Sequence, residues 1–154
     1  MTLEVGQPAP DFTLPGDGGT DISLEDYKGK KLVLFFYPKD STPGCTTEAI
    51  GFTEALSDFE EAGAVVVGMS KDSVKRHDNF IAKNDLKVRL ASDEEGTTID
   101  AYGSWVLKKL YGREYMGIDR STFLIDETGT VRKIWRKVKV KGHVEEVLEA
   151  VKSL

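Results

Sequence analysis

The chain has 154 residues, of which 40% are hydrophobic and 31% are charged. This composition is typical of a globular protein and too apolar for a disordered one, so we expect a single domain over residues 1–154. The formal net charge of −5 argues against nucleic acid as a partner, because phosphate binding needs a basic surface. No apolar run approaches the roughly 20 residues that span a bilayer, so we expect no association with a membrane.

The cysteine content limits the redox chemistry that the chain can perform. Cys45 is the only cysteine, so no disulfide can form within the chain. The opening residues 1–5 show neither the basic region nor the apolar core of a signal peptide. A lone thiol without an export signal is typical of a reducing compartment, and we therefore expect a cytoplasmic location.

Hydrophobic periodicity predicts the elements of the first half of the chain. In chain order they are a small hairpin over 12–24, a buried strand over 31–37, a helix over 44–62 and a second buried strand over 64–69. Both strands are continuous apolar runs, which is typical of strands covered on both faces. Strand, helix and strand in this order predict a βαβ unit with parallel strands and a right-handed crossover.

The second half continues the alternation of helices and strands. The expected elements are a polar helix over 73–84, a short strand over 88–91, a short helix over 97–102, a hairpin over 121–135 and an amphipathic helix over 142–151. Residues 136–141 alternate basic side chains with valine, which is the pattern of a strand with one wet face. Together these elements predict an α/β protein that resembles the thioredoxin fold. It has a central mixed sheet flanked by helices and an N-terminal β-hairpin extension.

The turn between the first buried strand and the first helix carries Cys45. Thr42 is a good N-cap residue and Pro43 a favoured first helical residue, so Cys45 falls in the first turn of the helix. There, unpaired backbone N–H groups and the helix dipole stabilise an anion, and the thiolate is the nucleophilic form of cysteine. A lone cysteine is also commonly a small buried apolar residue. The pattern by itself indicates a reactive thiol without excluding a packing role.

Several motifs around this turn resemble those of one family. Pro38-x-x-x-Thr42-x-x-Cys45 resembles the active-site motif of the peroxiredoxins. Residues 36–48 as a whole resemble the branch called bacterioferritin comigratory protein, or PrxQ. Further stretches that agree with this branch are 6–12, 77–80, 120–126 and 139–143. The resemblance extends over nearly the whole chain and implies a thioredoxin-like peroxidase.

The resemblance assigns a catalytic role to four residues. Cys45 matches the cysteine that attacks the peroxide O–O bond and becomes a sulfenic acid. Thr42 matches the hydroxyl that hydrogen-bonds the peroxide and the thiolate, and Pro38 matches the ring that shields the pocket from water. Arg120 matches the guanidinium that favours the thiolate and polarises the peroxide. Such preorganised donors stabilise the charge that develops on the departing oxygen.

The same resemblance implies a substrate-binding set and no cofactor. The peroxide is expected to contact Thr42, Gly44, Glu48 and Arg120, and its class is hydrogen peroxide or a small organic hydroperoxide. Glu48 matches a position that supports this network, although a first-turn carboxylate is also favoured by the helix dipole alone. His77 and His143 are far apart in sequence and lack companion ligands, so we expect no metal site, and surface or capping roles for both.

One feature departs from the branch that the chain resembles. That branch usually carries a second, resolving cysteine, either five residues after the first or in the next long helix. Ile50 occupies the first position, and Ile81 lies in a helix without cysteine. We therefore expect a one-cysteine cycle in antioxidant defence, reduced by an external thiol such as thioredoxin, glutaredoxin or a small thiol. The expected assembly is a monomer or a weak homodimer.

Two other functions are compatible with the same fold, because a fold does not define an activity. A thioredoxin-fold thiol–disulfide oxidoreductase normally uses Cys-x-x-Cys, but the paired positions hold Thr42 and Glu48. A non-catalytic binding module would account for the missing second cysteine. The joint presence of Pro38, Thr42, Cys45 and Arg120 favours the peroxidase.

Overall fold

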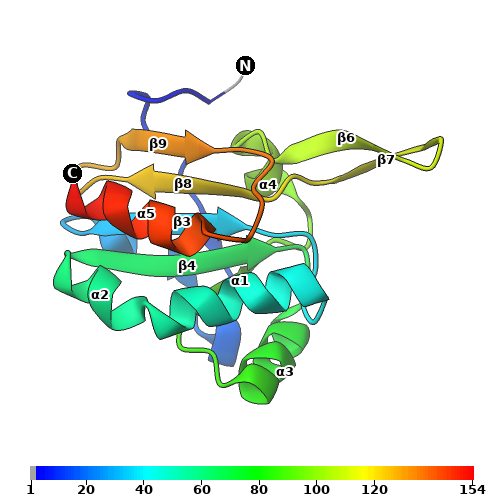
Figure 1. Cartoon of the computed structure of the whole chain (residues 1–154), viewed down its shortest axis with the longest axis horizontal. Helices are drawn as coiled ribbons and strands as arrows, with labels where there is room; N and C mark the ends of the chain where they lie inside the picture. The colour runs from blue at the N-terminus through cyan, green and yellow to red at the C-terminus, as the bar shows by residue number, and fades with distance from the viewer. Residues whose placement is uncertain (1–2) are drawn as a thin grey trace.

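The central element of the structure is a five-stranded sheet with the strand order β5-β4-β3-β8-β9 (Figure 1). The structure is a computed structural model that describes residues 3–154. The sheet strands are β3 (Lys31–Phe36), β4 (Ala64–Ser70), β5 (Arg89–Ser92), β8 (Ser121–Ile125) and β9 (Val131–Trp135). β3, β4 and β5 are parallel to one another, whereas β8 pairs antiparallel with both β3 and β9. The predicted mixed sheet is therefore present.

The continuous apolar sequence of β3 follows from its position in the middle of the sheet. It pairs on one side with β4 and on the other with β8, and every residue after Lys31 is buried. Leu34 and Phe36 contribute to the core on one face of the sheet, while Val33 and Phe35 contribute to the core on the other. Because neither face meets water, the period-2 alternation of a half-exposed strand is absent.

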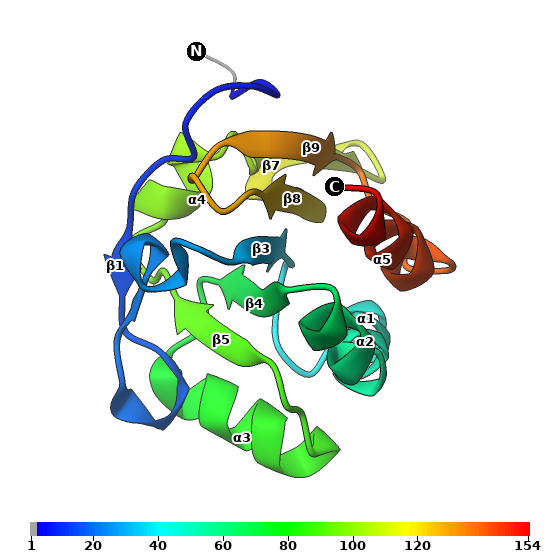
Figure 2. The same ribbon diagram turned by 90° about the vertical axis from the view of Figure 1, so that its left-hand side faces the viewer.

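Helices cover both faces of the sheet (Figure 2). They are α1 (Pro43–Glu54), α2 (Leu56–Glu61), α3 (Val74–Asn84), α4 (Thr97–Ala101) and α5 (His143–Lys152). In Figure 2, α1, α2 and α5 lie on one face, the N-terminal segment and α4 lie on the other, and α3 lies beside the edge strand β5. Among the residues that the structure describes, no helix is long and apolar enough to cross a membrane.

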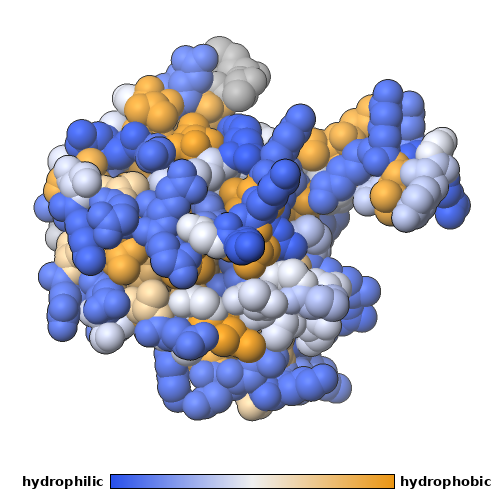
Figure 3. Space-filling view, in the orientation of Figure 1, coloured by the Kyte–Doolittle hydropathy of each residue, from blue (hydrophilic) through white to orange (hydrophobic). Residues whose placement is uncertain are grey.

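Two small hairpins lie outside the central sheet. β1 (Thr13–Leu14) and β2 (Ile22–Ser23) form the expected N-terminal hairpin. β6 (Trp105–Leu110) and β7 (Arg113–Ile118) form a second hairpin, which the sequence analysis did not predict. It projects from the body (Figure 1) and carries apolar and polar side chains next to one another (Figure 3).

Two predicted elements are wrong in their extent. The helix expected over 44–62 is interrupted at Ala55, whose φ of −91° and ψ of 1° end α1 and precede α2. The strand expected over 136–141 is an irregular connection between β9 and α5. Lys137 there has a φ of 49°, which turns the backbone out of an extended conformation. The Arg136 guanidinium donates instead to the carbonyl oxygens of Tyr102 and Gly103.

Candidate active site

The connection from β3 to α1 presents Cys45 to the interior of the protein. Pro43 begins α1, and Thr42 occupies the N-cap position, as the sequence predicted. The Thr42 hydroxyl donates to the carbonyl oxygen of Lys39 at 2.8 Å and makes no side-chain cap. The Thr42 side chain therefore satisfies none of the free N–H groups in the first turn of α1, which is the turn that contains Cys45.

Cys45 lies in the core between the sheet and α1. Its side chain is 1% exposed and belongs to the apolar cluster that includes Phe35 and Phe52. The rings of Phe35 and Phe52 stack with their centroids 4.6 Å apart. This environment resembles that of a packing cysteine, except that one polar group reaches the sulfur.

That polar group is the guanidinium of Arg120, just before β8. Nη2 of Arg120 donates to Sγ of Cys45 at 3.4 Å. Nη1 of the same side chain donates to Oε1 of Glu48 at 2.7 Å, and the two groups form an ion pair. The planar, multi-donor geometry of arginine allows one side chain to make both contacts, which a lysine cannot reproduce. Cys45, Glu48 and Arg120 thus form one connected group.

Burial and charge act in opposite directions on this group. Burial raises the pKa of Glu48 to about 7, and the neighbouring Arg120 guanidinium opposes the rise without cancelling it. Oε2 of Glu48 is buried without a hydrogen-bond partner, which is why desolvation dominates. For Arg120, burial lowers the pKa, but the nearby Glu48 and Cys45 raise it above its ordinary value. The guanidinium therefore stays charged beside the sulfur.

Gly44 is needed for this contact because of space rather than backbone conformation. A Cβ atom built on Gly44 would lie 3.1 Å from Nη2 of Arg120. An added side chain there would require the guanidinium to shift by a few tenths of an ångström. Gly44 also lines a groove of about 720 Å³ between α1 and α5, together with Pro43, Thr47, Lys141 and Val144 among other residues.

The structure does not bring every expected site residue together. Pro38 is exposed and lines a hollow that also contains Lys71 and Arg76 but not Cys45. Thr42 is half-buried, and its hydroxyl faces Lys39 rather than the sulfur. Shielding by Pro38 and peroxide binding by Thr42 therefore stay predictions.

The expected surface roles of the two histidines are wrong. His77 is 0% exposed and His143 is 3% exposed. Nε2 of His143 lies 2.8 Å from the hydroxyl oxygen of Thr122, and burial lowers the pKa of His143 to about 4. His77 contacts Asp40, in the loop before Cys45. Within residues 3–154, no cluster of acidic, histidine or cysteine side chains is suited to a metal.

The polar partners of the loop that precedes Cys45 were not among the expected site residues. Tyr37 and Asp40 are both buried, and the Tyr37 hydroxyl donates to Oδ1 of Asp40. Burial raises the pKa of Tyr37 well above its ordinary value. The available signal was an acidic residue directly after a buried strand, but the loop composition gave no reason to expect it to be buried.

Comparison with known proteins places this site in a family. Residues 5–134 match the AhpC/TSA family. Peroxiredoxin Bcp of Bacillus subtilis is 53% identical over 154 residues, covering 100% of this chain and 98% of the relative. Peroxiredoxin Bcp of Xanthomonas campestris is 48% identical over 148 residues, covering 95% of this chain and 92% of the relative. The chain therefore belongs to the AhpC/TSA family.

Solved structures support membership of the same family and indicate one branch of it. A cysteine-to-serine variant of Xylella fastidiosa PrxQ superimposes with a TM-score of 0.94 at 41% identity, covering 99% of this chain and 98% of that one. Xanthomonas campestris bacterioferritin comigratory protein gives a TM-score of 0.88 at 46% identity, covering 92% and 90%. Within its family the chain is a peroxiredoxin of the Bcp, or PrxQ, branch. The predicted thioredoxin-like fold and thiol-dependent peroxidase activity are confirmed.

Proposed function

We propose that Cys45 is the nucleophile of this thiol-dependent peroxidase and that it completes its cycle with an external thiol. The observation that carries the proposal is the contact between Nη2 of Arg120 and Sγ of Cys45 at 3.4 Å, at the first turn of α1. A fixed positive charge and the helix N-terminus both favour the thiolate over the thiol. No other sulfur nucleophile of the cysteine type exists in the chain.

The first step oxidises the cysteine and reduces the peroxide by two electrons. The Cys45 thiolate attacks one oxygen of the hydroperoxide, so that an S–O bond forms while the O–O bond breaks. The leaving oxygen departs as an alkoxide or hydroxide and takes up a proton to become an alcohol or water. Arg120 stabilises the charge on that oxygen, and Glu48 holds Arg120 in position through the 2.7 Å ion pair.

The second step returns Cys45 to the thiol. A sulfenic acid condenses with a thiol to give a mixed disulfide and water, and a second thiol then releases the cysteine. Because Cys45 is the only cysteine, both thiols come from outside the chain. Ile50 and Ile81 are both half-buried side chains that pack against the core. The Xanthomonas campestris relative, in contrast, has been solved as two variants in which different cysteines are replaced by serine.

The substrate range extends from hydrogen peroxide to organic hydroperoxides. The groove between α1 and α5 has a volume of about 720 Å³ and reaches Gly44, the residue before Cys45. Its lining includes neither Cys45 nor Arg120, so the substrate class is supported by a relative rather than by this groove. The Xanthomonas campestris protein is described by its alkyl peroxide reduction activity, which supports the same class for this chain.

The proposed partner is a reduced thiol of the thioredoxin, glutaredoxin or small-molecule class. An enzyme that depends on external thiols needs a reducing compartment, so we assign it to the cytoplasm, where it acts in antioxidant defence. We assign it as a monomer or a weak homodimer, since the central sheet and its helices already bury both cores within one chain. A disulfide oxidoreductase is disfavoured because Thr42 and Glu48 stand where a paired cysteine would be needed.

The test is Cys45→Ser, with Thr47→Ser as the matched control. Thr47 is an exposed hydroxyl on the same helix, and it donates to the carbonyl oxygen of Pro43. Peroxide consumption in the presence of excess dithiothreitol should disappear in Cys45→Ser and persist in Thr47→Ser. Intact mass after one equivalent of peroxide should show one added oxygen in the control only. Undiminished turnover of Cys45→Ser would refute the assignment.

A further inference from the structure

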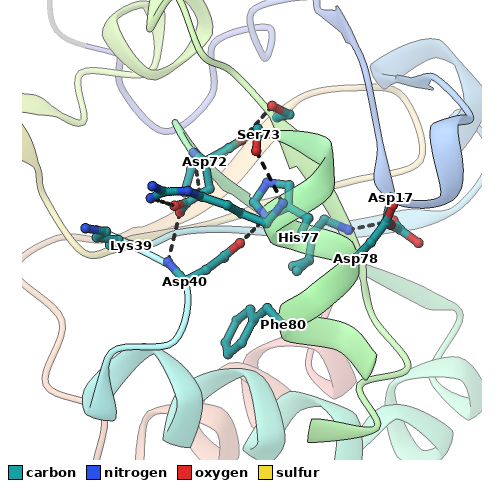
Figure 4. A network of polar contacts seen from close by, with 12 residues as sticks. Asp17, Lys39, Asp40, Asp72, Ser73, His77, Asp78 and Phe80 are labelled. Atoms are coloured by element: carbon teal, nitrogen blue, oxygen red, sulfur yellow. Dashed lines mark hydrogen bonds and ion pairs between the residues drawn. The ribbon is translucent and has the colours of Figure 1, made fainter. Parts of the chain in front are cut away.

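His77 makes two hydrogen bonds that together define its protonation. Its ring is fully buried on α3, with Nδ1 2.7 Å from Oδ2 of Asp40 and Nε2 3.0 Å from the carbonyl oxygen of Ala91 (Figure 4). A carboxylate and a carbonyl oxygen only accept hydrogen bonds. Both contacts are made only when the His77–Asp40 pair holds one proton more than a neutral imidazole beside a carboxylate.

Asp40, the partner of His77, is held at three points. Its Oδ1 accepts from the Tyr37 hydroxyl and its Oδ2 faces His77. Its backbone N–H donates to Oδ2 of Asp72 at 2.8 Å, and that same oxygen accepts from the Ser70 hydroxyl at 2.7 Å. Figure 4 shows Asp40, Asp72 and His77 converging from the loop after β3, the loop after β4 and α3. Both the main chain and the side chain of Asp40 are therefore fixed.

The held loop connects directly to the reactive cysteine. Asp40 lies midway between Pro38 and Thr42, and Ser41 beside it has a φ of 64°. Residues other than glycine rarely adopt this backbone conformation, and it persists only where surrounding contacts impose it. The carbonyl oxygen of Thr42 in turn accepts the N–H of Thr46 at 2.9 Å, within the first turn of α1. The position of Asp40 thus sets the start of the helix that carries Cys45.

We propose that His77 is a positioning residue for the peroxidase reaction, acting through its buried hydrogen bond with Asp40 on the loop from Pro38 to Thr42. The proposal rests on the proposed function of Cys45. His77 touches neither the substrate nor the sulfur. It keeps Thr42 and the first turn of α1 in the geometry that aligns Cys45 with the peroxide. Misplacement by about 1 Å is enough to lower a rate by about 100-fold.

The charged and titratable groups around His77 come from several elements. Tyr37 and Asp40 in the loop after β3, and Asp72 after β4, face the ring or its partner. On α3 itself, Arg76 pairs with Asp72 at 3.6 Å. Asp78 accepts from the backbone N–H of Gly18 at 2.8 Å. Asp78 therefore holds α3 to the N-terminal segment without touching the loop before Cys45, which makes it a matched control.

The first experiment measures the rate constant for oxidation of Cys45 by hydrogen peroxide in single turnover, with rapid quenching and intact mass. His77→Ala should lower this rate constant about 10- to 100-fold. Asp78→Ala should leave it within twofold of the wild type while lowering the thermal midpoint. Equal rate constants in His77→Ala and Asp78→Ala would overturn the proposal. An unreactive wild-type Cys45 would instead refute the proposed function.

The second experiment uses Asp40→Asn, which is nearly isosteric and remains informative if His77→Ala does not fold. An amide can donate to Nδ1 of a neutral His77 ring while Nε2–H still donates to Ala91, so the loop stays in place when the ring is neutral. The rate constant of Asp40→Asn should therefore stay near that of the wild type at about pH 8, whereas Asp40→Ala, which cannot make the contact, should lower it about 10- to 100-fold. Equal rate constants in the two variants would overturn the contact with His77 as the positioning device.

Discussion

Replacing Arg120 by methionine removes the positive charge that contacts Cys45 and keeps most of the side-chain volume. The lost contact is the hydrogen bond from Nη2 to Sγ at 3.4 Å. Removing one preorganised donor from a site of developing negative charge typically costs about 100- to 1000-fold in rate. The Arg120 side chain is 17% exposed, so solvent weakens its field. We therefore expect a loss of about 100-fold, at the lower end of that range.

Methionine also leaves the Glu48 carboxyl buried without its partner, so a second variant is needed to separate rate from stability. The double variant Arg120→Met with Glu48→Gln removes the stranded acid. Its thermal midpoint should recover relative to Arg120→Met, whereas its rate constant should not. Arg120→Lys should be intermediate in rate, because one ammonium cannot reach both the sulfur and Glu48.

The assay is single-turnover oxidation of Cys45 by hydrogen peroxide under pseudo-first-order conditions, with folding checked by circular dichroism at the same temperature. The reasoning fails if Arg120→Met stays within threefold of the wild type. It also fails if the double variant regains the wild-type rate constant, since the loss would then come from the stranded carboxyl rather than from the missing donor.

Three further changes test other parts of the site. Gly44→Ala should slow the same reaction about tenfold by displacing Arg120, whose Nη2 would lie 3.1 Å from the new methyl group; an unchanged rate constant would contradict the close approach. Burial lowers the pKa of His143 to about 4 from 6.5, so the unfolded chain binds the extra proton first and the contribution of His143 to stability falls by up to about 3 kcal/mol as pH drops through this window, while the raised pKa of Glu48 acts in the opposite direction in both proteins. In urea unfolding, the difference in free energy of unfolding between the wild type and His143→Gln should change by about that amount across the window, and a difference independent of pH would rule out this origin. Ile50→Cys should form a disulfide with Cys45 and resist overoxidation only if α1 unwinds, because five residues of helix rise about 7.5 Å and a bridge needs Cα atoms within about 7 Å; mass spectrometry of the peroxide-treated variant decides.

The central sheet could be predicted because its signal is local. β3 and β4 are continuous apolar runs, and such runs predict strands that are buried on both faces. The break at Ala55 has no such signal, because alanine is the best helix former. The β6–β7 hairpin lacks such a pattern because its side chains are not divided between a buried and an exposed face. Leu107 and Met116, for example, are about half exposed.

The site divides in the same way. The position of Cys45 in a first helical turn follows from Thr42 and Pro43, which are neighbours in the sequence. The contact with Arg120 joins residues 75 positions apart, and only the resemblance to a family indicated it. The burial of His77 depends on Asp40 and on the carbonyl oxygen of Ala91. No pattern within α3 encodes those two partners.

The near-complete burial of Cys45 makes the two halves of the cycle unequal in what they demand of the protein. A residue that is 1% exposed demands less movement from a small hydroperoxide than from a cysteine on another protein, which could reach the sulfur only if the first turn of α1 moved aside. On the proposed cycle, reduction by a protein thiol would then draw on local opening, a property that varies from one part of a fold to another. The stability of that single turn then acts as a kinetic gate. A firmer turn excludes unrelated thiols and lengthens the life of the sulfenic acid, and so lengthens its exposure to a second peroxide.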